Sequence, residues 1–358
     1  MPKKIKILFT IPNFDTAGSG KVVLSLAQGL DKEKFIAEIC TTSNKGSFFE
    51  TVQGSGIKLH VFNYLAPRKL GWEFFKSVFQ TFRFFKSCNP DIIHSYHYAS
   101  EFSEGLAARL AGCKWIFTKK NMAWSNKGWY LRSLLANRII ATNQSIKHTF
   151  YPSSSKIEVI YSSVNTVNFP FSERENLLRN FIVVGNIAPI KGTETIIRAF
   201  LSYCDRYPGN LIFVGNDTNE YAKSIKLDIE LSEHKNRIVF EGPKADIRYY
   251  FDQSFCLIMA SDKNGEGGPV ALLEAMAHGL LVIGSKVPGI NEQLQNFPEL
   301  LFEPNDSNAL LNKMAEMFNS TDAKISSLRK ALRAEVEHRF SLDSEIEKHQ
   351  ILFQQLLN

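Results

Sequence analysis

Two glutamates, Glu266 and Glu274, are spaced so that they could hold the two ends of a polar ligand. Glu266 lies in a glycine-rich stretch, residues 261–268, that predicts a loop. Pro269 suits the first position of a helix, and the apolar spacing of residues 270–278 predicts that helix. Glu274 therefore lies in an apolar helix, where a buried carboxylate needs a partner. That partner could be a backbone N–H group, an arginine or a ligand.

The start of this predicted helix is also suited to bind an anion. The free N–H groups of a first helical turn and the helix dipole both favour negative charge at the same point. A ligand with phosphates in its middle and hydroxyl groups at both ends would place its phosphates there and its hydroxyl groups on the two carboxylates. A nucleotide sugar has this arrangement, so the segment favours a nucleotide-sugar site.

The segment EGGPVALLEAMAHG, from Glu266 to Gly279, resembles the E-x7-E signature of retaining GT-B glycosyltransferases of family 4. The downstream PGINE, from Pro288 to Glu292, resembles the continuation of that signature. The resemblance implies that Glu266 holds hydroxyl groups of the donor sugar in the catalytic site and that Glu274 holds the ribose. It also implies that the donor phosphates lie against the residues that follow Glu266, which are Gly267, Gly268, Pro269, Val270 and Ala271.

Two further segments of the second half resemble donor-binding parts of the same family. Residues 185–192, GNIAPIKG, resemble its Gly-Arg-x4-Lys-Gly pattern, in which the arginine and the lysine grip the donor diphosphate. Lys191 matches the lysine, and an ordinary surface lysine is the alternative. Asn186 replaces the arginine, which removes a bidentate charge. Pro243 belongs to a turn that resembles the one lying against the nucleotide base.

The first half opens with a strand-like run, residues 6–12, and the loop sequence TAGSGK. A Walker A loop is excluded because Asp15 and Val22 stand where it needs a glycine and a serine or threonine. The sequence resembles instead the family's Gly-Gly-x-x-Arg/Lys-Val pattern. Gly18 would then admit the donor phosphates to the backbone, and a plain tight turn is the alternative.

Three residues of the first half are candidates for the acceptor side of the reaction. His94 ends a predicted strand, where it could bind substrate or be a core histidine, and His97 lies in the next loop. Lys120 stands where the family commonly has a catalytic histidine, and Tyr96 stands at another histidine position. A lysine can hold an anion, but it moves protons near neutral pH only if its pKa is depressed.

Length and composition indicate a globular protein of two domains. The chain has 358 residues, of which 44% are hydrophobic and 22% charged. It contains no apolar run long enough to span a membrane and no signal-peptide cleavage pattern. Its five cysteines are scattered without CxxC pairs, which favours reduced thiols in a cytoplasmic protein and no metal site.

Charge is divided unevenly along the chain. Residues 1–165 hold 22 Lys and Arg against 10 Asp and Glu, whereas the remainder holds 20 against 26. A basic half suggests an anionic partner, such as nucleic acid, a phosphorylated acceptor or an anionic membrane surface. Residues 70–86 interleave seven aromatic residues with Lys76, Arg83 and Lys86. Together with Arg68, this pattern predicts either a helix on a membrane interface or one that covers a sheet.

A pattern of alternating strand and helix signals occurs twice along the chain, which predicts an α/β protein of two Rossmann-like doubly wound domains. The resemblance implies that these domains form a GT-B fold and face a central cleft. Residues 1–170 would form the acceptor-binding domain and 171–343 the donor-binding domain. The polar residues 172–180 would link them, and a helix over 344–358 would pack back on the first domain.

The resemblance implies a retaining hexosyltransferase that uses a UDP- or GDP-sugar. The acceptor would be a hydroxyl of a membrane-associated glycan or lipid-linked precursor of a cell-surface polysaccharide, such as lipopolysaccharide, at the inner face of the plasma membrane. No cofactor and no metal are expected, because the nucleotide sugar is a substrate and the sequence shows no DxD pair at a strand end. The alternatives are a sugar-nucleotide epimerase and a degenerate nucleotide-sugar-binding protein, which Asn186 and Lys120 would suit. A nucleic-acid partner is disfavoured because no recognition motif accompanies the basic residues.

Overall fold

The computed structural model describes residues 3–15, 17–46, 48–67, 69–124, 126–172, 179–262 and 266–357. The chain forms two compact units: unit 1 is Met1–Ser162 with Leu342–Asn358, and unit 2 is Ser163–Ser341. The chain thus passes between the units a few residues before positions 170 and 343, where the sequence placed the boundaries. Most of the linker expected at 172–180 lies outside the described residues.

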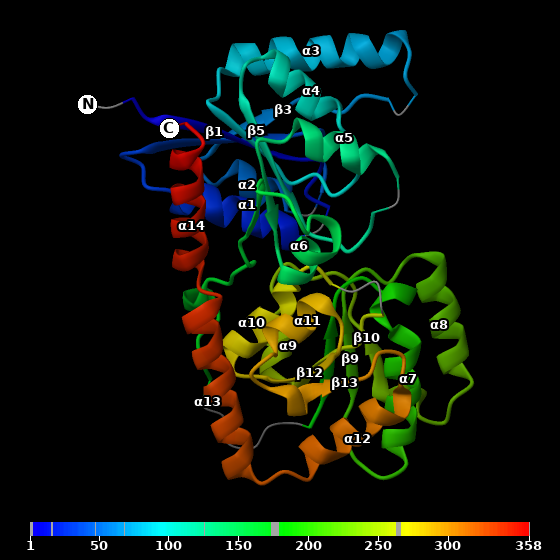
Figure 1. Cartoon of the computed structure of the whole chain (residues 1–358). Helices are drawn as coiled ribbons and strands as arrows, with labels where there is room; N and C mark the ends of the chain where they lie inside the picture. The colour runs from blue at the N-terminus through cyan, green and yellow to red at the C-terminus, as the bar shows by residue number, and fades with distance from the viewer. Residues whose placement is uncertain are drawn as a thin grey trace. The chain divides into compact units, whose positions relative to one another are not determined.

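Unit 1 is a seven-stranded parallel sheet with the strand order β3-β2-β1-β4-β5-β6-β7 (Figure 1). Its strands are β1 (Ile5–Ile11), β2 (Phe35–Thr41), β3 (Lys58–Val61), β4 (Ile92–Ser95), β5 (Lys114–Lys119), β6 (Arg138–Ala141) and β7 (Ile157–Val159). Its helices are α1 (Ala17–Gly29), α2 (Phe49–Gln53), α3 (Trp72–Cys88), α4 (Ser103–Leu110), α5 (Gly128–Leu135), α6 (Gln144–Phe150) and α14 (Leu342–Gln355).

Helices cover both faces of this sheet, so its central strands β4 and β5 are buried along nearly their whole length. Figure 1 shows α3 and α4 on one face, and α1 with α14 on the other. The C-terminal helix α14 is fastened to α1 and its following turn: Gln350 accepts a hydrogen bond of 2.8 Å from the Asp31 N–H, and Ile346 packs on Gly29. The last segment of the chain therefore belongs to the helical layer that covers this face of the sheet.

Unit 2 is a six-stranded parallel sheet with the order β10-β9-β8-β11-β12-β13. Its strands are β8 (Phe181–Val184), β9 (Leu211–Val214), β10 (Ile238–Phe240), β11 (Cys256–Met259), β12 (Leu281–Ser285) and β13 (Leu301–Phe302). Its helices are α7 (Thr193–Cys204), α8 (Glu220–Glu230), α9 (Arg248–Asp252), α10 (Val270–His278), α11 (Pro288–Gln293), α12 (Ser307–Phe318) and α13 (Asp322–Arg339). Short 3-10 helices are η1 (Thr166–Asn168), η2 (Pro189–Lys191), η3 (Lys235–Arg237) and η4 (Pro298–Leu300).

Strand order reverses once in each sheet, between β1 and β4 in unit 1 and between β8 and β11 in unit 2. The connections that leave two such strands run in opposite directions, so an opening forms at their carboxyl ends, where ligands of doubly wound sheets bind. The segments after β1, β4, β8 and β11 carry Gly18, His97, Lys191 and Glu266. The expected doubly wound α/β architecture is confirmed, and these four predicted site residues follow its switch-point strands.

Local structure differs from the prediction at two glycine-containing segments. The sequence TAGSGK was expected to be a loop, but helix α1 begins within it at Ala17, so Gly18 lies in the first turn of the helix. Gly20 is needed for packing, because a Cβ there would come within 3.0 Å of the rings of Phe14 and Phe48. The sequence Val-Pro-Gly at 287–289 is typical of a turn, but the structure has helix α11 there, with Pro288 at its first position. Over the described ranges, no helix is long and apolar enough to cross a membrane.

Candidate active site

The predicted donor residues Lys191 and Glu266 meet in unit 2. Lys191 ends η2, which follows β8, and Glu266 lies between β11 and α10. Their side chains form an ion pair, and the Ser261 hydroxyl donates a further hydrogen bond of 2.9 Å to Glu266 Oε1. Both side chains keep part of their surface exposed, 36% for Lys191 and 18% for Glu266, so a ligand can reach the pair.

Two glycines bring the backbone of this site together. Gly192 has φ of +66°, and a Cβ there would lie 2.0 Å from the carbonyl oxygen of Ala260. A Cβ on Gly289 would lie 2.2 Å from the carbonyl oxygen of Glu266, to which the Gly289 N–H donates a bond of 2.9 Å. Both glycines lie within the segments GNIAPIKG and PGINE, whose resemblance to the family gave neither of them a role. Their positions, directly after Lys191 and Pro288, were the signal in the sequence that could have indicated a close approach of the backbone.

The remaining donor candidates surround this pair or lie at neighbouring strand ends. Gly267, Gly268 and Pro269 lead into α10, with Pro269 as its N-cap residue and Gly279 in the left-handed region at its end, and Val270 and Ala271 form its first turn. Glu274 is buried on that helix. Asn186 is exposed and lines a small cavity with Lys191 and Ser261. Pro243 is exposed in the turn after β10.

In unit 1 the structure brings Lys120 to the helical turn that contains Gly18. Lys120 Nζ lies 3.3 Å from the hydroxyl of Ser19, in the first turn of α1, and 4.6 Å from the centroid of the Tyr96 ring. Burial lowers the pKa of Lys120 to about 8, and the carboxylate of Glu345 on α14 partly opposes that shift. A lysine in this position can therefore both hold an anion and exchange a proton close to neutral pH.

The preceding lysine, Lys119, anchors the same loop. Its ammonium lies 3.7 Å from the centroid of the Trp129 ring and donates to Asn121 Oδ1 at 2.9 Å and to the Ala123 carbonyl at 2.7 Å. Burial lowers the pKa of Lys119 to about 7. The neighbouring lysines thus have different surroundings, since Lys119 binds its own loop and Lys120 faces the start of α1.

The two histidine candidates are placed differently. His94 is a core residue: its Nε2 shares a hydrogen bond of 2.8 Å with Thr118 Oγ1, and its ring packs against Tyr96 and His349. Burial, and then the neighbouring His349, lowers the pKa of His94 well below its usual value, so its ring is neutral. The geometry corresponds to the core interpretation of His94. His97 lies beyond the strand end and is 8% exposed.

A buried ionic network that the sequence analysis missed holds the loop of His97. Arg132 of α5 donates to the Ser95 hydroxyl at 3.0 Å, to the His97 carbonyl at 3.1 Å and to the Glu101 carbonyl at 2.5 Å. Glu104 of α4 accepts from Ser95 at 2.6 Å and from Thr10. Burial raises the pKa of Glu104, and Arg132 opposes that shift. The signal in the sequence that could have found this network was a charged residue among apolar residues of a helix, Arg132 in α5 and Glu104 in α4, as for Glu274 in α10.

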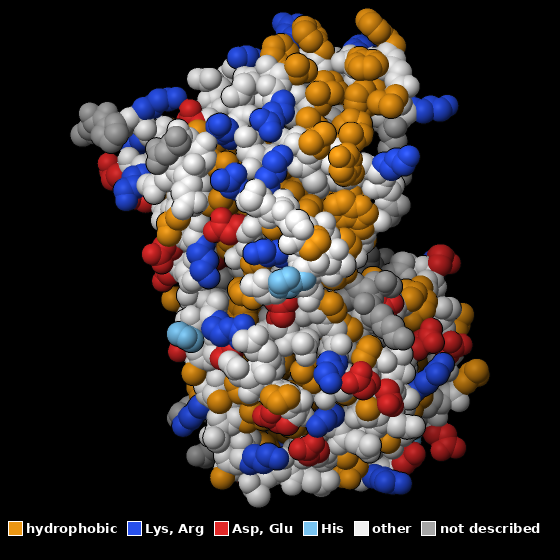
Figure 2. Space-filling model, in the orientation of Figure 1, with side chains coloured by type: hydrophobic (Ala, Val, Ile, Leu, Met, Phe, Trp, Pro, Cys, Tyr) orange, Lys and Arg blue, Asp and Glu red, His pale blue; other side chains and the backbone are white. Residues whose placement is uncertain are grey.

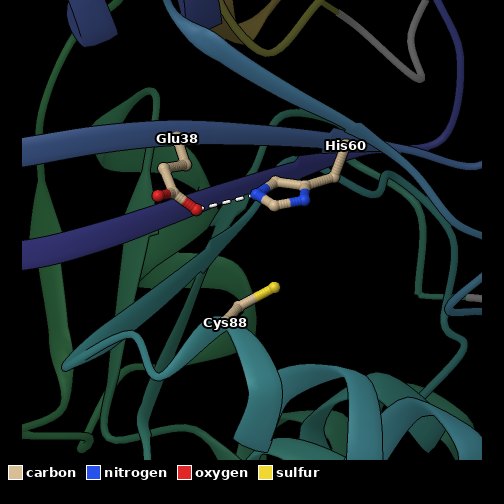
Figure 3. A group of neighbouring side chains, drawn as sticks. All are labelled: Glu38, His60 and Cys88. Carbon is tan, nitrogen blue, oxygen red and sulfur yellow. Dashed lines mark hydrogen bonds and ion pairs between the residues drawn. The ribbon is translucent and has the colours of Figure 1, made fainter.

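Glu38, His60 and Cys88 also lie together in unit 1, with potential metal-ligating atoms within 4.8 Å of one another (Figure 3). Glu38 accepts from Lys6 at 2.9 Å and approaches Lys58 at 3.3 Å, and its second oxygen shares a bond of 2.7 Å with His60 Nε2. Burial acts to raise the pKa of Glu38, but the bonds to His60 and Lys6 outweigh it, and the pKa is lowered. Because two ammonium groups already neutralise this carboxylate, we interpret the cluster as an ion-pair network that joins β1, β2 and β3.

Comparison with known proteins agrees with this architecture. The O-antigen chain mannosyltransferase RfbU of Salmonella typhimurium is 31% identical over 182 residues, which are 50% of this chain and 49% of that protein. An Escherichia coli UDP-Gal:alpha-D-GlcNAc-diphosphoundecaprenol alpha-1,3-galactosyltransferase is 23% identical over 78% of this chain and 79% of its own. The crystal structure of Anabaena Alr3699/HepE in complex with UDP and glucose superimposes with a TM-score of 0.81 at 18% identity, covering 98% of this chain and 99% of that one.

The two doubly wound units and this structural similarity define the GT-B fold of glycosyltransferases, as expected. Residues 137–338 match the profile named glycosyl transferases group 1, and residues 16–168 match the profile named glycosyltransferase family 4. The chain belongs to the glycosyl transferases group 1 family. Its match to the Salmonella mannosyltransferase spans about half the length of that protein.

Proposed function

We propose that the protein transfers a sugar from a nucleoside-diphosphate sugar to a hydroxyl group of a glycan or lipid-linked acceptor. The observation that carries this proposal is the pair of Lys191 and Glu266 at the β8/β11 switch point, directly before the N-terminus of α10. Lys191 and the N–H groups of the first turn of α10 would hold the diphosphate, Glu266 the hydroxyl groups of the sugar, and Glu274 the ribose.

We propose UDP as the first nucleotide to test. The Anabaena structure of the same fold contains UDP and glucose, and the name of the E. coli relative specifies UDP-galactose. Asn186 stands in the loop after β8, where the family pattern has an arginine, and it carries no charge. We therefore expect Lys191 to contribute more of the electrostatic attraction for the diphosphate in this chain than the corresponding lysine does beside an arginine.

The transfer would proceed with retention at the anomeric carbon. The bond from that carbon to the diphosphate oxygen breaks, the acceptor oxygen bonds on the same face, and the acceptor proton passes to the departing diphosphate. The protein would position the reactants and stabilise the charge that develops on the leaving group. Lys191 and the α10 N-terminus supply positive charge, and we propose that no metal ion is required. In unit 1, Lys120 and His97 would face the acceptor.

We propose further that the acceptor is a lipid-linked precursor of a cell-surface polysaccharide at an anionic membrane surface. Unit 1 holds 23 Lys and Arg against 13 Asp and Glu, a formal charge of +10, whereas unit 2 holds 19 against 23, a charge of −4. The name of the E. coli relative specifies a diphosphoundecaprenol-linked acceptor. A basic unit 1 would attract both an anionic bilayer and a diphosphate-linked acceptor.

The test is a panel of UDP-, GDP- and ADP-sugars, with and without a polyprenyl-diphosphate-linked sugar, scored for nucleoside diphosphate release and for thermal shift. We expect release with one donor and loss of release in Glu266→Gln at an unchanged melting temperature. A thermal shift without release under any condition would indicate a binding protein instead, and an altered sugar without release would indicate an epimerase. Absence of both release and thermal shift for every donor would refute the nucleotide-sugar site itself.

A further inference from the structure

The helix α5 of unit 1 has a reversed distribution of polarity. The one charged side chain within the helix, Arg132, is fully buried beneath it, in the network that holds the His97 loop. Its outward-facing residues are apolar: Tyr130, Leu131 and Leu134 are between 40% and 64% exposed. A surface helix normally turns its apolar stripe to the core and its charges to water. The outer face of α5 therefore lacks the polar side chains that water would favour.

The helix α3 extends this apolar face. Phe74, Val78 and Phe85 point into the core, but Trp72, Phe75 and Phe79 are 79%, 60% and 57% exposed. These three residues are three and four positions apart, so they form one stripe along the outer side of the first half of the helix. The sequence allowed the aromatic residues of this segment either to cover the sheet or to reach a membrane. The structure divides them between an inner, buried set and an outer, exposed set.

The two apolar stripes belong to one surface. The helix α4 packs on both α3 and α5, and Figure 2 shows apolar side chains gathered over α3 and α5 with lysine and arginine side chains beside them. The exposed basic residues of these helices include Lys76, Arg83 and Lys86 on α3 and Lys127 at the start of α5. Arg68, which the sequence analysis grouped with them, lies outside the described residues.

We propose that the outer faces of α3 and α5 form a docking surface for an anionic lipid bilayer, with their aromatic and leucine side chains in the interfacial layer and the lysines and arginines on the lipid head groups. Exposed aromatic rings flanked by basic residues are the composition that such a layer favours. The charge of +10 on unit 1 matches an anionic surface.

This inference rests on the proposed transfer to a lipid-linked acceptor, because docking would bring that acceptor to the unit that contains His97 and Lys120. The inner side of α5 is bonded through Arg132 to the loop of His97, at the carboxyl end of β4. A bilayer on the outer side of α5 would therefore present an acceptor within the same unit as His97 and Lys120. Docking would raise the rate with a lipid-linked acceptor and leave donor binding unaffected.

Binding can be observed with a natural reporter. Of the four tryptophans, Trp72 is 79% exposed, whereas Trp115 and Trp129 are buried and Trp124 is half-buried. With the full chain, vesicles of phosphatidylcholine and phosphatidylglycerol should shift the tryptophan emission to the blue, and vesicles of phosphatidylcholine alone should shift it far less. Trp72→Phe should lose the spectral shift but still sediment with the vesicles, because the ring remains apolar.

Matched variants separate the apolar and electrostatic contributions. Phe79→Ser with Leu134→Ser should abolish co-sedimentation, whereas Leu227→Ser, which alters an even more exposed leucine on α8 of unit 2, should not. Lys76→Gln and Arg83→Gln should each weaken binding about fivefold at low salt, and Lys32→Gln, at an exposed lysine of unit 1 outside the surface, should change it little.

The results that would overturn the proposal are distinct from failure of the proposed function. Equal sedimentation of the wild type and Phe79→Ser/Leu134→Ser would exclude the surface, even if sugar transfer is normal. If the double variant instead changed the oligomeric state by light scattering while wild-type protein ignored vesicles, the surface would be a contact between copies of this chain. If no donor gave nucleoside diphosphate release but the protein still bound vesicles, the transfer reaction would be refuted and the docking surface would remain supported.

Discussion

Replacing Gly192 by alanine tests how the donor site is assembled. Gly192 has φ of +66°, a conformation that costs an alanine about 1 kcal/mol. In addition, the new Cβ would lie 2.0 Å from the Ala260 carbonyl oxygen, a backbone atom of the β11 end that cannot rotate away. Relieving such an overlap typically costs a further ~1–3 kcal/mol. We therefore expect Gly192→Ala to lower the free energy of unfolding of unit 2 by about 2–4 kcal/mol.

The matched control is Gly112→Ala, which has φ of +79° and no atom within 4 Å of the added Cβ. It carries the conformational cost alone, so it should lower stability by only about 1 kcal/mol. Urea unfolding followed by circular dichroism measures both effects, and calorimetric titration with UDP measures donor binding. Because Gly192→Ala must displace Lys191 from Glu266, it should also weaken UDP binding, whereas the control should not. Equal losses of stability in the two variants, or unchanged UDP binding in Gly192→Ala, would refute the reasoning.

Three further predictions concern charged residues. Lys191→Gln should raise the dissociation constant of the donor by about 10- to 100-fold, the loss expected for a charge-assisted bond to phosphate, and unchanged affinity in titration calorimetry would exclude Lys191 from the diphosphate site. If the Lys120 ammonium holds an anionic substrate, the transfer rate should decline as the pH rises through the pKa of about 8, because the lysine loses its charge there. Lys120→Gln should remove this decline from the pH profile, and a rate that increases above that pH would indicate that Lys120 acts as a base instead. Arg132→Met leaves the Glu104 carboxylate buried without its cation and should lower the free energy of unfolding by about 3 kcal/mol. In urea unfolding, the double variant Glu104→Gln/Arg132→Met should recover part of this lost stability, and strictly additive losses would show that the two residues are not coupled.

Local sequence patterns were sufficient to predict most secondary-structure elements and to indicate the candidate donor site. Apolar runs bounded by glycine and proline predicted most strands and helices, because burial on both faces of a parallel sheet leaves little choice of residue. Glu266 and Glu274 were recognisable as candidate site residues because a glycine-rich loop before a helix is suited to bind an anion, and this signal is local in the sequence. The helix end at Gly279 was equally local, since glycine adopts the left-handed conformation there at little cost.

Contacts between residues distant in the sequence could not be predicted from local patterns, because they depend on how the strands and helices pack. The pairing of Lys191 with Glu266 depends on β8 lying beside β11, which the strand order sets and no local pattern encodes. His94 could have been a substrate ligand until α14, from the far end of the chain, packed His349 against it. Arg132 shows the limit most clearly: its helical spacing alone does not say which face is turned inward. Its burial against partners on other segments decided that α5 exposes its apolar side, because a buried guanidinium is retained only where such partners satisfy it.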